Sequence, residues 1–487
     1  MIKTRIAPSP TGELHIGTMR SLLYNYAFAK KSEGTFLLRI EDTDRERYVE
    51  GAVERMYQVI ADYGLSWDEG PLVGGPNEPY LQSQRLDLYK KYALELVAQG
   101  HAYYCFCTKQ RLEELRQAQQ AAHLPVTKYD QACLALSADQ VEANLQKKVP
   151  YVIRLKVPAE RVLEYTDLVL GRVSFPYNDV EDQVLLKSDG YPTYHLAVVV
   201  DDHLMGVTHI LRGREWLAST PKHLLLYDFL GWEMPKTGHL PVLKEVGATK
   251  KMSKRLGDVA AVDFLKNGYL PEALLNFLML LGWNPGTDQE LFTLAEFVKA
   301  FSLERIHKTD LVAFDREKLA WFNGHYLHAL SAEGLYDRLV AWAKKWDVEL
   351  VSAESDQSDI IQVIELIKDR LKVLADFNEL ASYFFRDPQV DPTMLSAYAD
   401  QKWPAILTEF YRLYQELPEN AWVSEQLETI SQTVLTKTNS SAKAAFMTLR
   451  AVVTGQTATP PLFAILEVLG KATVLRRLSA FLPPNSN

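Results

Sequence analysis

The feature that most limits the possible folds is a change in the hydrophobic pattern near Asn323. Before this point, short apolar runs alternate with segments whose apolar residues recur at helical spacing, whereas helical spacing dominates after it. Alternating strands and helices favour a parallel α/β sheet, and an uninterrupted series of helices favours a bundle. We therefore expect an α/β half followed by a separate all-helical half.

The N-terminal segment shows the α/β pattern most clearly. A strand expected at Lys3–Ala7 leads into turn-forming residues and then into a helix from His15 to about Lys31. A strand at Phe36–Ile40 completes a β-α-β unit, which predicts parallel strand pairing. Further strands are expected at Tyr151–Val157, Val162–Val169, Gln183–Lys187, Tyr194–Val200 and His209–Leu211. Further helices are expected at Leu224–Leu230, Ile360–Leu374, Trp403–Glu416, Ala442–Val453 and Leu462–Leu469.

Composition excludes several protein classes. A chain of 487 residues with 47% hydrophobic and 24% charged side chains is typical of a large globular protein, not of a disordered chain or a coiled-coil rod. Three cysteines are too few for a disulfide scaffold and fit a reducing compartment. Because no secretory leader or membrane span is evident, we expect a cytoplasmic protein without membrane contacts. The net charge of −9 argues against a surface that binds nucleic acid uniformly.

Two segments carry recognisable chemistry. The first, Arg5–Gly17, places His15 and Gly17 where a turn enters a helix, and it matches neither the Walker A nor the Rossmann glycine pattern. A helix N-terminus with a glycine and a histidine can bind a phosphate, although an ordinary capped helix is the alternative. The second segment, Lys250–Gly257, holds four cations within six residues. It can neutralise a triphosphate in a transition state, or it is a solvated basic turn.

Together, and in this order, the two segments resemble the paired signatures of the class I aminoacyl-tRNA synthetases. His15-Ile16-Gly17-Thr18 is similar to the HIGH element, and Lys251-Met252-Ser253-Lys254-Arg255 is similar to the KMSKS element. Three further segments narrow the resemblance to the bacterial glutamyl-tRNA synthetases over essentially the whole chain: residues 39–44 (RIEDTD), 194–203 (YHLAVVVDDH) and 212–216 (RGREW).

This resemblance implies a Rossmann-type class I catalytic domain interrupted by an inserted α/β region and followed by helices. The implied divisions are residues 1–100 for the first catalytic half, 101–190 for the inserted tRNA-acceptor-binding region, 191–325 for the second catalytic half with the stem-contact region and the KMSKR loop, and 326–487 for the helical anticodon-binding region.

The resemblance also implies a reaction. L-Glutamate is activated by ATP to glutamyl-adenylate and transferred to the 3′-terminal adenosine of tRNA(Glu), with magnesium held largely by the ATP phosphates. Glutamate carries two carboxylates and one ammonium, so its pocket needs cations and a carboxylate. The implied glutamate-binding residues are Arg5, Ala7, Ser9, Glu41, Tyr194 and Arg212. The implied ATP-binding residues are His15, Gly17, Glu215 and Lys254, and the implied catalytic residues are His15, Lys251, Lys254 and Arg255.

Two features of the expected pocket stay open. Glu41 and Arg212 can instead form a structural ion pair. Val198 stands where the family often has asparagine, so the pocket either lacks one polar contact or replaces it with a water.

The three cysteines lie within the expected insert. Some members of the resembling family bind zinc there through a Cys-x-Cys pair, a later cysteine and a fourth ligand. Cys105, Cys107 and Cys133 match the thiols, and Tyr129 matches the tyrosine ligand of truncated paralogues, whereas Ala135 occupies the position of the histidine used by other relatives. The alternative is a set of buried free thiols.

The helical half contains a local excess of positive charge. Residues 431–487 carry six Lys and Arg residues against one Glu, a net charge of +5, while residues 326–430 carry −10 and residues 1–325 carry −4. Such a cluster suits RNA phosphates, with a solvated basic face as the alternative, and the resemblance places Arg370 at an anticodon base. The overall charge of −9 is thus compatible with local RNA contacts on a negative body.

Other enzymes and other classes remain as alternatives. The long helical half opposes a glutaminyl counterpart and a tRNA-modifying paralogue. A catalytically silent RNA-binding homologue would have no need for the joint presence of Arg5, His15, Gly17, Glu41, Lys251 and Lys254. We expect a monomer, and the sequence leaves open whether glutamine tRNA is also charged.

Overall fold

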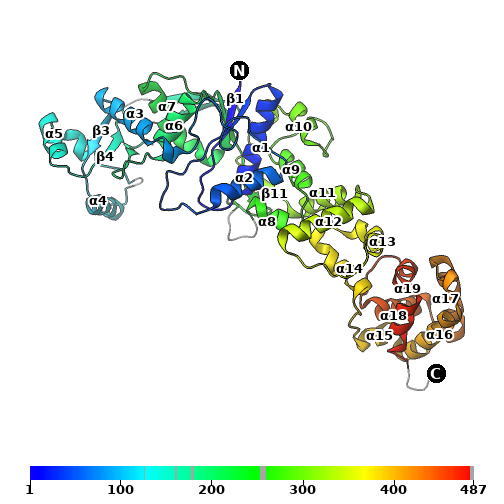
Figure 1. Ribbon diagram of the computed structural model, residues 1–487. Helices are drawn as coiled ribbons and strands as arrows, with labels where there is room; N and C mark the ends of the chain where they lie inside the picture. Colours follow the sequence, from blue (N-terminus) through cyan, green and yellow to red (C-terminus); the bar gives the residue numbers. More distant parts are fainter. Residues whose placement is uncertain (125–126, 159–161, 177–179, 253–258, 483–487) are drawn as a thin grey trace. The chain divides into compact units, whose positions relative to one another are not determined.

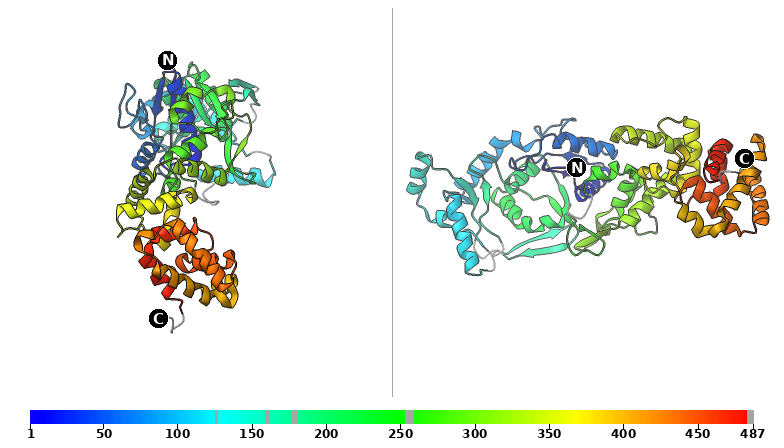
Figure 2. Two further views of the ribbon diagram at one scale, coloured as in Figure 1. Left: turned by 90° about the vertical axis from the view of Figure 1, so that its right-hand side faces the viewer. Right: turned by 90° about the horizontal axis from the view of Figure 1, so that it is seen from below.

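The computed structural model describes residues 1–124, 127–158, 162–176, 180–252 and 259–482 (Figure 1). The chain divides into two compact units, residues 1–264 with 274–315 and residues 265–273 with 316–487. All described strands belong to the first unit, and the yellow to red part of the chain in Figure 2 consists of helices and their connections. The expected α/β half and helical half are therefore confirmed. None of the described helices is long and apolar enough to cross a membrane.

Two parallel strand pairs organise the first unit. Strand β1 (Lys3–Ile6) pairs with β2 (Thr35–Leu38), and α1 (Ile16–Lys31) is the crossover helix between them. Strand β8 (His209–Gly213) pairs with β9 (Lys236–Leu240), and the Thr208 N–H donates to the Lys3 carbonyl at 2.9 Å, which places β8 beside β1. Helix α1 buries Met19, Leu22 and Leu23, so the predicted β-α-β unit forms around an apolar helix.

Antiparallel strands lie between β2 and β8 in the chain. Strands β3 (Ala102–Cys105), β4 (Val152–Leu155) and β7 (Val184–Leu186) make a three-stranded sheet in that order, while β5 (Leu163–Asp167) and β6 (Gly171–Phe175) form a hairpin. A parallel pair, β10 (Val242–Glu245) and β11 (Leu311–Phe314), lies later in the chain. The other helices before residue 316 are α2 (Ala52–Asp62), α3 (Leu86–Ala98), α4 (Lys109–Ala121), α5 (Ala138–Gln146), α6 (Tyr194–Leu204), α7 (Thr220–Phe229), α8 (Ala261–Lys266), α9 (Pro271–Leu280) and α10 (Leu294–Ala300).

The segment Tyr194–Val200 is a helix, and the expectation of a strand there was wrong. It forms the first part of α6, whose residues 196–202 are all buried. A short continuous apolar run is compatible with either a buried strand or a buried helix, because no polar face reveals its period. The two aspartates that follow are part of the helix and are buried too, since arginines compensate their charge.

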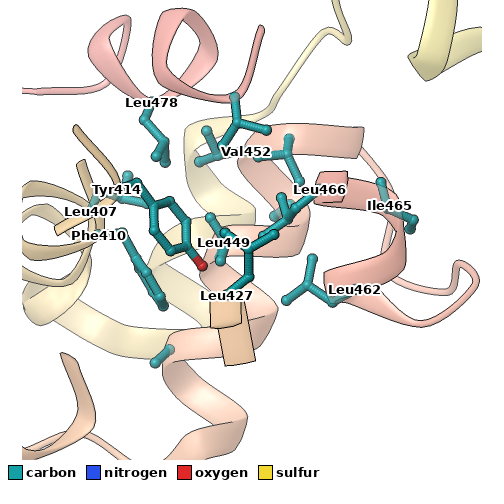
Figure 3. Close-up of a cluster of buried hydrophobic side chains, with 14 of the residues drawn as sticks. Leu407, Phe410, Tyr414, Leu427, Leu449, Val452, Leu462, Ile465, Leu466 and Leu478 are labelled. Atoms are coloured by element: carbon teal, nitrogen blue, oxygen red, sulfur yellow. The ribbon is translucent and has the colours of Figure 1, made fainter. Parts of the chain in front are cut away.

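The second unit is built from helices around two apolar clusters. Its helices are α11 (Arg316–His328), α12 (Ala332–Trp346), α13 (Gln357–Ile367), α14 (Phe377–Phe385), α15 (Pro392–Ala399), α16 (Trp403–Glu416), α17 (Ser424–Thr438), α18 (Ala442–Thr454) and α19 (Leu462–Ser479). Figure 3 shows one cluster, in which Phe410 and Tyr414 of α16 pack near Leu427 and Leu449. Helix α13 ends at Ile367, earlier than expected, and α19 continues past Leu469 through a kink at Gly470.

Candidate active site

A cavity of about 430 Å³ lies in the first unit, where β1 and β8 end. Ligands of open parallel sheets bind at the carboxyl ends of the strands, as they would here. The cavity is lined by ten residues that the sequence singled out: Arg5, Ala7, Ser9, His15, Gly17, Glu41, Tyr194, Arg212, Glu215 and Lys251. Residues nearly 250 positions apart in the chain are thus brought together around one space.

The N-terminus of α1 forms one wall of the cavity. The His15 imidazole caps the helix, because its Nδ1 accepts the Gly17 N–H at 2.9 Å. In the neutral ring the proton therefore lies on Nε2, which makes that atom a donor. A Cβ at position 17 would lie only 3.2 Å from His15 Nδ1, so the glycine keeps this cap undistorted. The capped helix proposed as an alternative is present, and it also orients the histidine beside the cavity.

Arg5 and Glu41 line a second wall of the cavity, and they belong to a group of buried charges that balance one another. Asp202 accepts from Arg5 through two hydrogen bonds of 3.2 Å and from Arg39 at 2.7 Å. Arg39 also donates to Glu41 at 3.0 Å. Behind them, Asp201 accepts from Arg85 at 2.7 Å. Three guanidinium groups therefore face three carboxylates, and α6 supplies two of these from a helix whose other buried residues are apolar.

Burial and neighbouring charge shift the pKa values of Asp202 and Glu41 in opposite directions. Although burial alone would raise it, Arg5 and Arg39 hold the pKa of Asp202 below its ordinary value. Burial raises the pKa of Glu41, with Arg39 and Arg5 opposing the shift. The charge of Asp202 is thus already compensated by the two arginines. Glu41 is the carboxylate whose ionised form a further cation, such as an ammonium, would stabilise most.

Arg212 differs from Arg5, Arg39 and Arg85, which pair with carboxylates, because its side-chain partners are all neutral. Its Nε donates to His239 Nε2 at 3.0 Å and its Nη2 to the Thr220 hydroxyl at 2.9 Å, while its Nη1 lies 3.4 Å from both the Tyr194 hydroxyl and His223 Nδ1. Within the described part of the chain, no carboxylate forms an ion pair with it. Glu41 pairs with Arg39 instead, so the proposed Glu41–Arg212 ion pair is not formed.

The structure describes only the first residues of the cationic segment Lys250–Gly257. Lys251 Nζ lies 2.5 Å from Glu215 Oε1, and both side chains are partly exposed. The backbone N–H of Met252 donates to the Leu243 carbonyl at 2.9 Å, and its side chain is buried. Lys254 and Arg255 lie outside the described residues.

Val198 belongs to the apolar core of α6 and is not among the residues that line the cavity. It is 1% exposed and packs in a cluster that includes Leu225 of α7. The side chain therefore fills a core position one turn after Tyr194.

The three cysteines and Tyr129 are brought together near the end of β3. The three Sγ atoms lie within 4.8 Å of one another, and Cys107 Sγ is 3.5 Å from Cys133 Sγ. The Tyr129 hydroxyl lies 3.4 Å from Cys105 Sγ and 3.3 Å from Cys107 Sγ. A zinc–sulfur bond of about 2.3 Å places tetrahedral thiolates about 3.8 Å apart, so these donors fit a zinc ion with little movement.

Most of the basic residues of the C-terminal segment already have partners. Lys437 pairs with Glu409 at 2.6 Å, Arg476 and Arg477 pair with Asp387, and Arg450 and Lys471 donate to backbone carbonyls. Among the described residues, Lys443 is the one cation of the six without such a partner. Arg370 donates to the Ala458 carbonyl at 3.2 Å and is partly engaged as well.

Several residues around the cavity had no role in the sequence-based prediction. Asp201 and Asp202 stood in a segment that carried the family resemblance, but their pairing with arginines was not predicted. Thr220, His223 and His239, which contact Arg212, and Asp167, which contacts His239, gave no signal in the sequence, because only the fold brings their side chains together.

The comparisons with known proteins agree with this geometry. Residues 1–321 match the family model for class I tRNA synthetases (E and Q), catalytic domain, and residues 334–482 match an anticodon binding domain. The chain is 43% identical to a glutamate–tRNA ligase of Clostridioides difficile (strain 630) over 98% of both proteins. It is 42% identical to that of Chlorobium phaeobacteroides (strain DSM 266 / SMG 266 / 2430), over 98% of this chain and 97% of the relative.

A solved structure extends the likeness to three dimensions. The crystal structure of a glutamate tRNA ligase from Elizabethkingia meningosepticum CCUG26117, in complex with its amino acid, superposes with a TM-score of 0.86 at 31% identity and 99% coverage of both chains. Cavity, sequence and backbone thus point the same way, and the chain belongs to the glutamate–tRNA ligases, a family of class I tRNA synthetases.

Proposed function

We propose that this chain activates L-glutamate with ATP in the 430 Å³ cavity and transfers it to the 3′-terminal adenosine of tRNA(Glu). The observation that carries the proposal is Arg212, a buried guanidinium surrounded by neutral partners in the described structure. Burying a cation without a counter-charge is costly, so the site favours a ligand that brings a carboxylate. The side chain of glutamate is such a ligand.

The other groups of the substrate find complementary partners. The α-ammonium suits Glu41, whose carboxylate accepts a hydrogen bond from one side chain of the described structure, that of Arg39. Tyr194 and Ser9 offer neutral hydrogen bonds, and the Arg5 guanidinium is fixed by Asp202 through its Nε and Nη2, which leaves its Nη1 for the ligand. In the proposed arrangement the α-carboxylate faces the N-terminus of α1, where His15 and Gly17 line the cavity.

The chemistry requires positioning and charge stabilisation, with no side-chain nucleophile. An oxygen of the α-carboxylate attacks the α-phosphorus of ATP, the bond to pyrophosphate breaks, and glutamyl-adenylate forms. A hydroxyl of the terminal adenosine then attacks the activated carbonyl carbon, and AMP leaves. His15, Gly17 and Lys251 line the cavity, and we assign them to the charge that develops on the phosphates. Sequence resemblance alone assigns Lys254 and Arg255 to the same task. Magnesium enters with ATP, bound mainly by phosphate oxygens.

The reaction is tested by ATP–pyrophosphate exchange with and without tRNA(Glu). We expect exchange that depends on glutamate and on tRNA, because the family resemblance implies that bound tRNA is needed for activation. Exchange supported by glutamine in place of glutamate would contradict the proposal, and so would a complete lack of exchange with every component present.

We also propose that Cys105, Cys107, Cys133 and Tyr129 hold a structural zinc ion. Three sulfurs and a phenol oxygen complete a four-ligand set, and the spacing of the sulfurs fits tetrahedral coordination. Protein purified without chelator should contain about one equivalent of zinc by elemental analysis, and Cys107→Ser should lose most of it. Less than a tenth of an equivalent in the unmodified chain would exclude the site in favour of free thiols.

For tRNA we propose a few phosphate contacts. Since five of the six C-terminal cations are engaged, the logarithm of the tRNA association constant should fall with the logarithm of the salt concentration with a slope of about 4 or less. Lys443→Ala should lower this slope by about one. Lys437→Ala, which removes a cation already paired with Glu409, is the matched control and should leave it unchanged. A slope of about ten or more would contradict the proposal.

The expected monomeric state and cytoplasmic location stay predictions. Gel filtration of the chain alone would test the first of them.

A further inference from the structure

Two buried side chains behind Arg212, those of His239 and Asp167, have no part in the reaction as described. Arg212 at the end of β8 contacts His239 of β9, and His239 contacts Asp167 at the end of β5. The Arg212 Nε to His239 Nε2 distance is 3.0 Å, and the His239 Nδ1 to Asp167 Oδ2 distance is 2.6 Å. The side chains of His239 and Asp167 are both 0% exposed.

The contacts determine which nitrogen of His239 carries the proton. The Nε of an arginine is always a donor, so His239 Nε2 must be the acceptor. The single proton of the neutral ring therefore lies on Nδ1 and is donated to Asp167. Burial lowers the pKa of His239, although Asp167 opposes the shift, and a neutral ring agrees with the hydrogen bond from Arg212.

Asp167 is itself held in one orientation. Its Oδ1 accepts the backbone N–H groups of Val169 and Leu170 at 2.9 Å each and that of His239 at 3.2 Å. Its Oδ2 accepts the Tyr165 hydroxyl at 3.0 Å besides His239 Nδ1. The carboxylate cannot rotate without losing these amide donors, so it fixes the imidazole in one tautomer.

The neutral ring also separates the carboxylate from the guanidinium. Arg5, by contrast, contacts Asp202 directly through two hydrogen bonds. A direct contact between Asp167 and Arg212 would compensate the charge of the arginine within the protein. With His239 between them, Arg212 is oriented by hydrogen bonds while its positive charge stays available to a ligand.

We propose that His239 and Asp167 are positioning residues that fix Arg212 toward the side-chain carboxylate of glutamate and thereby set the preference for glutamate over glutamine. This inference rests on the proposed function, because it assumes that Arg212 binds the amino-acid side chain. Neither residue contacts the cavity, and both act through Arg212.

The substitution Asp167→Asn tests the proposal, because it should change the tautomer of His239. Because three backbone N–H groups face Oδ1, the asparagine oxygen must take that place, and its NH₂ group then faces His239 Nδ1. The ring proton then lies on Nε2, where it faces the N–H of Arg212 Nε. Two donors meet, so the hydrogen bond between Arg212 and His239 is lost. A comparable exchange of aspartate for asparagine beside a histidine is known to impose the wrong tautomer. In ATP–pyrophosphate exchange with tRNA, we expect KM for glutamate to rise at least about tenfold, kcat to change less, and glutamate-over-glutamine selectivity to fall.

A double-mutant cycle separates this effect from simple destabilisation. Glutamine at position 239 has no tautomers, and its oxygen can still accept from Arg212, so Asp167→Asn should have little further effect on KM in the His239→Gln background. Tyr165→Phe removes a hydroxyl that donates to the same Oδ2 and lies 3.2 Å from His239 Nδ1. It leaves the Asp167 carboxylate to accept the ring proton on Nδ1, so it should keep KM within about twofold. An equal effect of Asp167→Asn in both backgrounds, or unchanged selectivity, would overturn the proposal.

Two further outcomes are distinguishable. If Asp167→Asn does not fold, His239→Gln should still keep a lower KM than His239→Ala, and equal values for these two variants would overturn the proposal. Lack of glutamate-dependent exchange in the unmodified chain would overturn the proposed function, whereas normal exchange with unaffected variants would overturn this inference alone.

Discussion

Arg212→Gln should lower kcat/KM for glutamate by about a thousandfold, because removing one partner of a desolvated charge pair costs about 4 kcal/mol. Glutamine is too short and neutral to replace the fork that donates to the ligand carboxylate. Most of the loss should appear in KM for glutamate, measured by ATP–pyrophosphate exchange, while KM for ATP changes little. Arg212→Lys should recover only part of the loss, since an ammonium keeps the charge and loses the bidentate geometry.

The control for this variant is Arg116→Gln. Arg116 lies on α4 and is paired with Glu113 on the protein surface, so its replacement should leave both KM values unchanged. Activity of Arg212→Gln within about tenfold of the unmodified chain would show that the side-chain carboxylate binds elsewhere.

Lys254→Ala should slow the formation of glutamyl-adenylate by at least about a hundredfold, because a cation that meets the developing charge on the phosphates is lost. Affinity for tRNA should stay nearly intact, since the role assigned to this lysine lies in the chemical step. Single-turnover measurements of adenylate formation, together with a tRNA binding titration, separate the two quantities.

Lys250→Ala provides the matched comparison. Lys250 is an exposed cation immediately before the five-residue KMSKR element and should tolerate replacement with little effect on the single-turnover rate. If Lys254→Ala reacts as fast as Lys250→Ala, the role inferred for Lys254 is wrong.

The sequence was sufficient for the fold class and for ten of the residues that line the cavity. Local patterns revealed β1, α1 and β2, because each shows a clear period or turn signal. Residues such as Arg212 were assigned by resemblance, and the structure places them at the carboxyl ends of the strands. Their roles in catalysis are still proposals.

The features that could not be predicted depend on contacts between distant segments. The segment Tyr194–Val200 lacks a polar face, so its period could not identify the helix. The pairing of Asp167 with His239 joins positions 72 residues apart. Counting charge in the C-terminal segment overestimated the available cations, because Asp387 and Glu409, which bind three of them, lie outside that segment.

The neutral surroundings of Arg212 also have a thermodynamic consequence. A buried cation without a counter-charge lowers the stability of the ligand-free fold, and an incoming carboxylate removes that cost. Folding and substrate binding are therefore linked: glutamate at about 100 times its dissociation constant would add about 2.7 kcal/mol to the free energy of unfolding. The partners of Arg212 come from α6, α7 and β9. Bound glutamate should therefore stabilise these three elements against unfolding as well as the wall of the cavity.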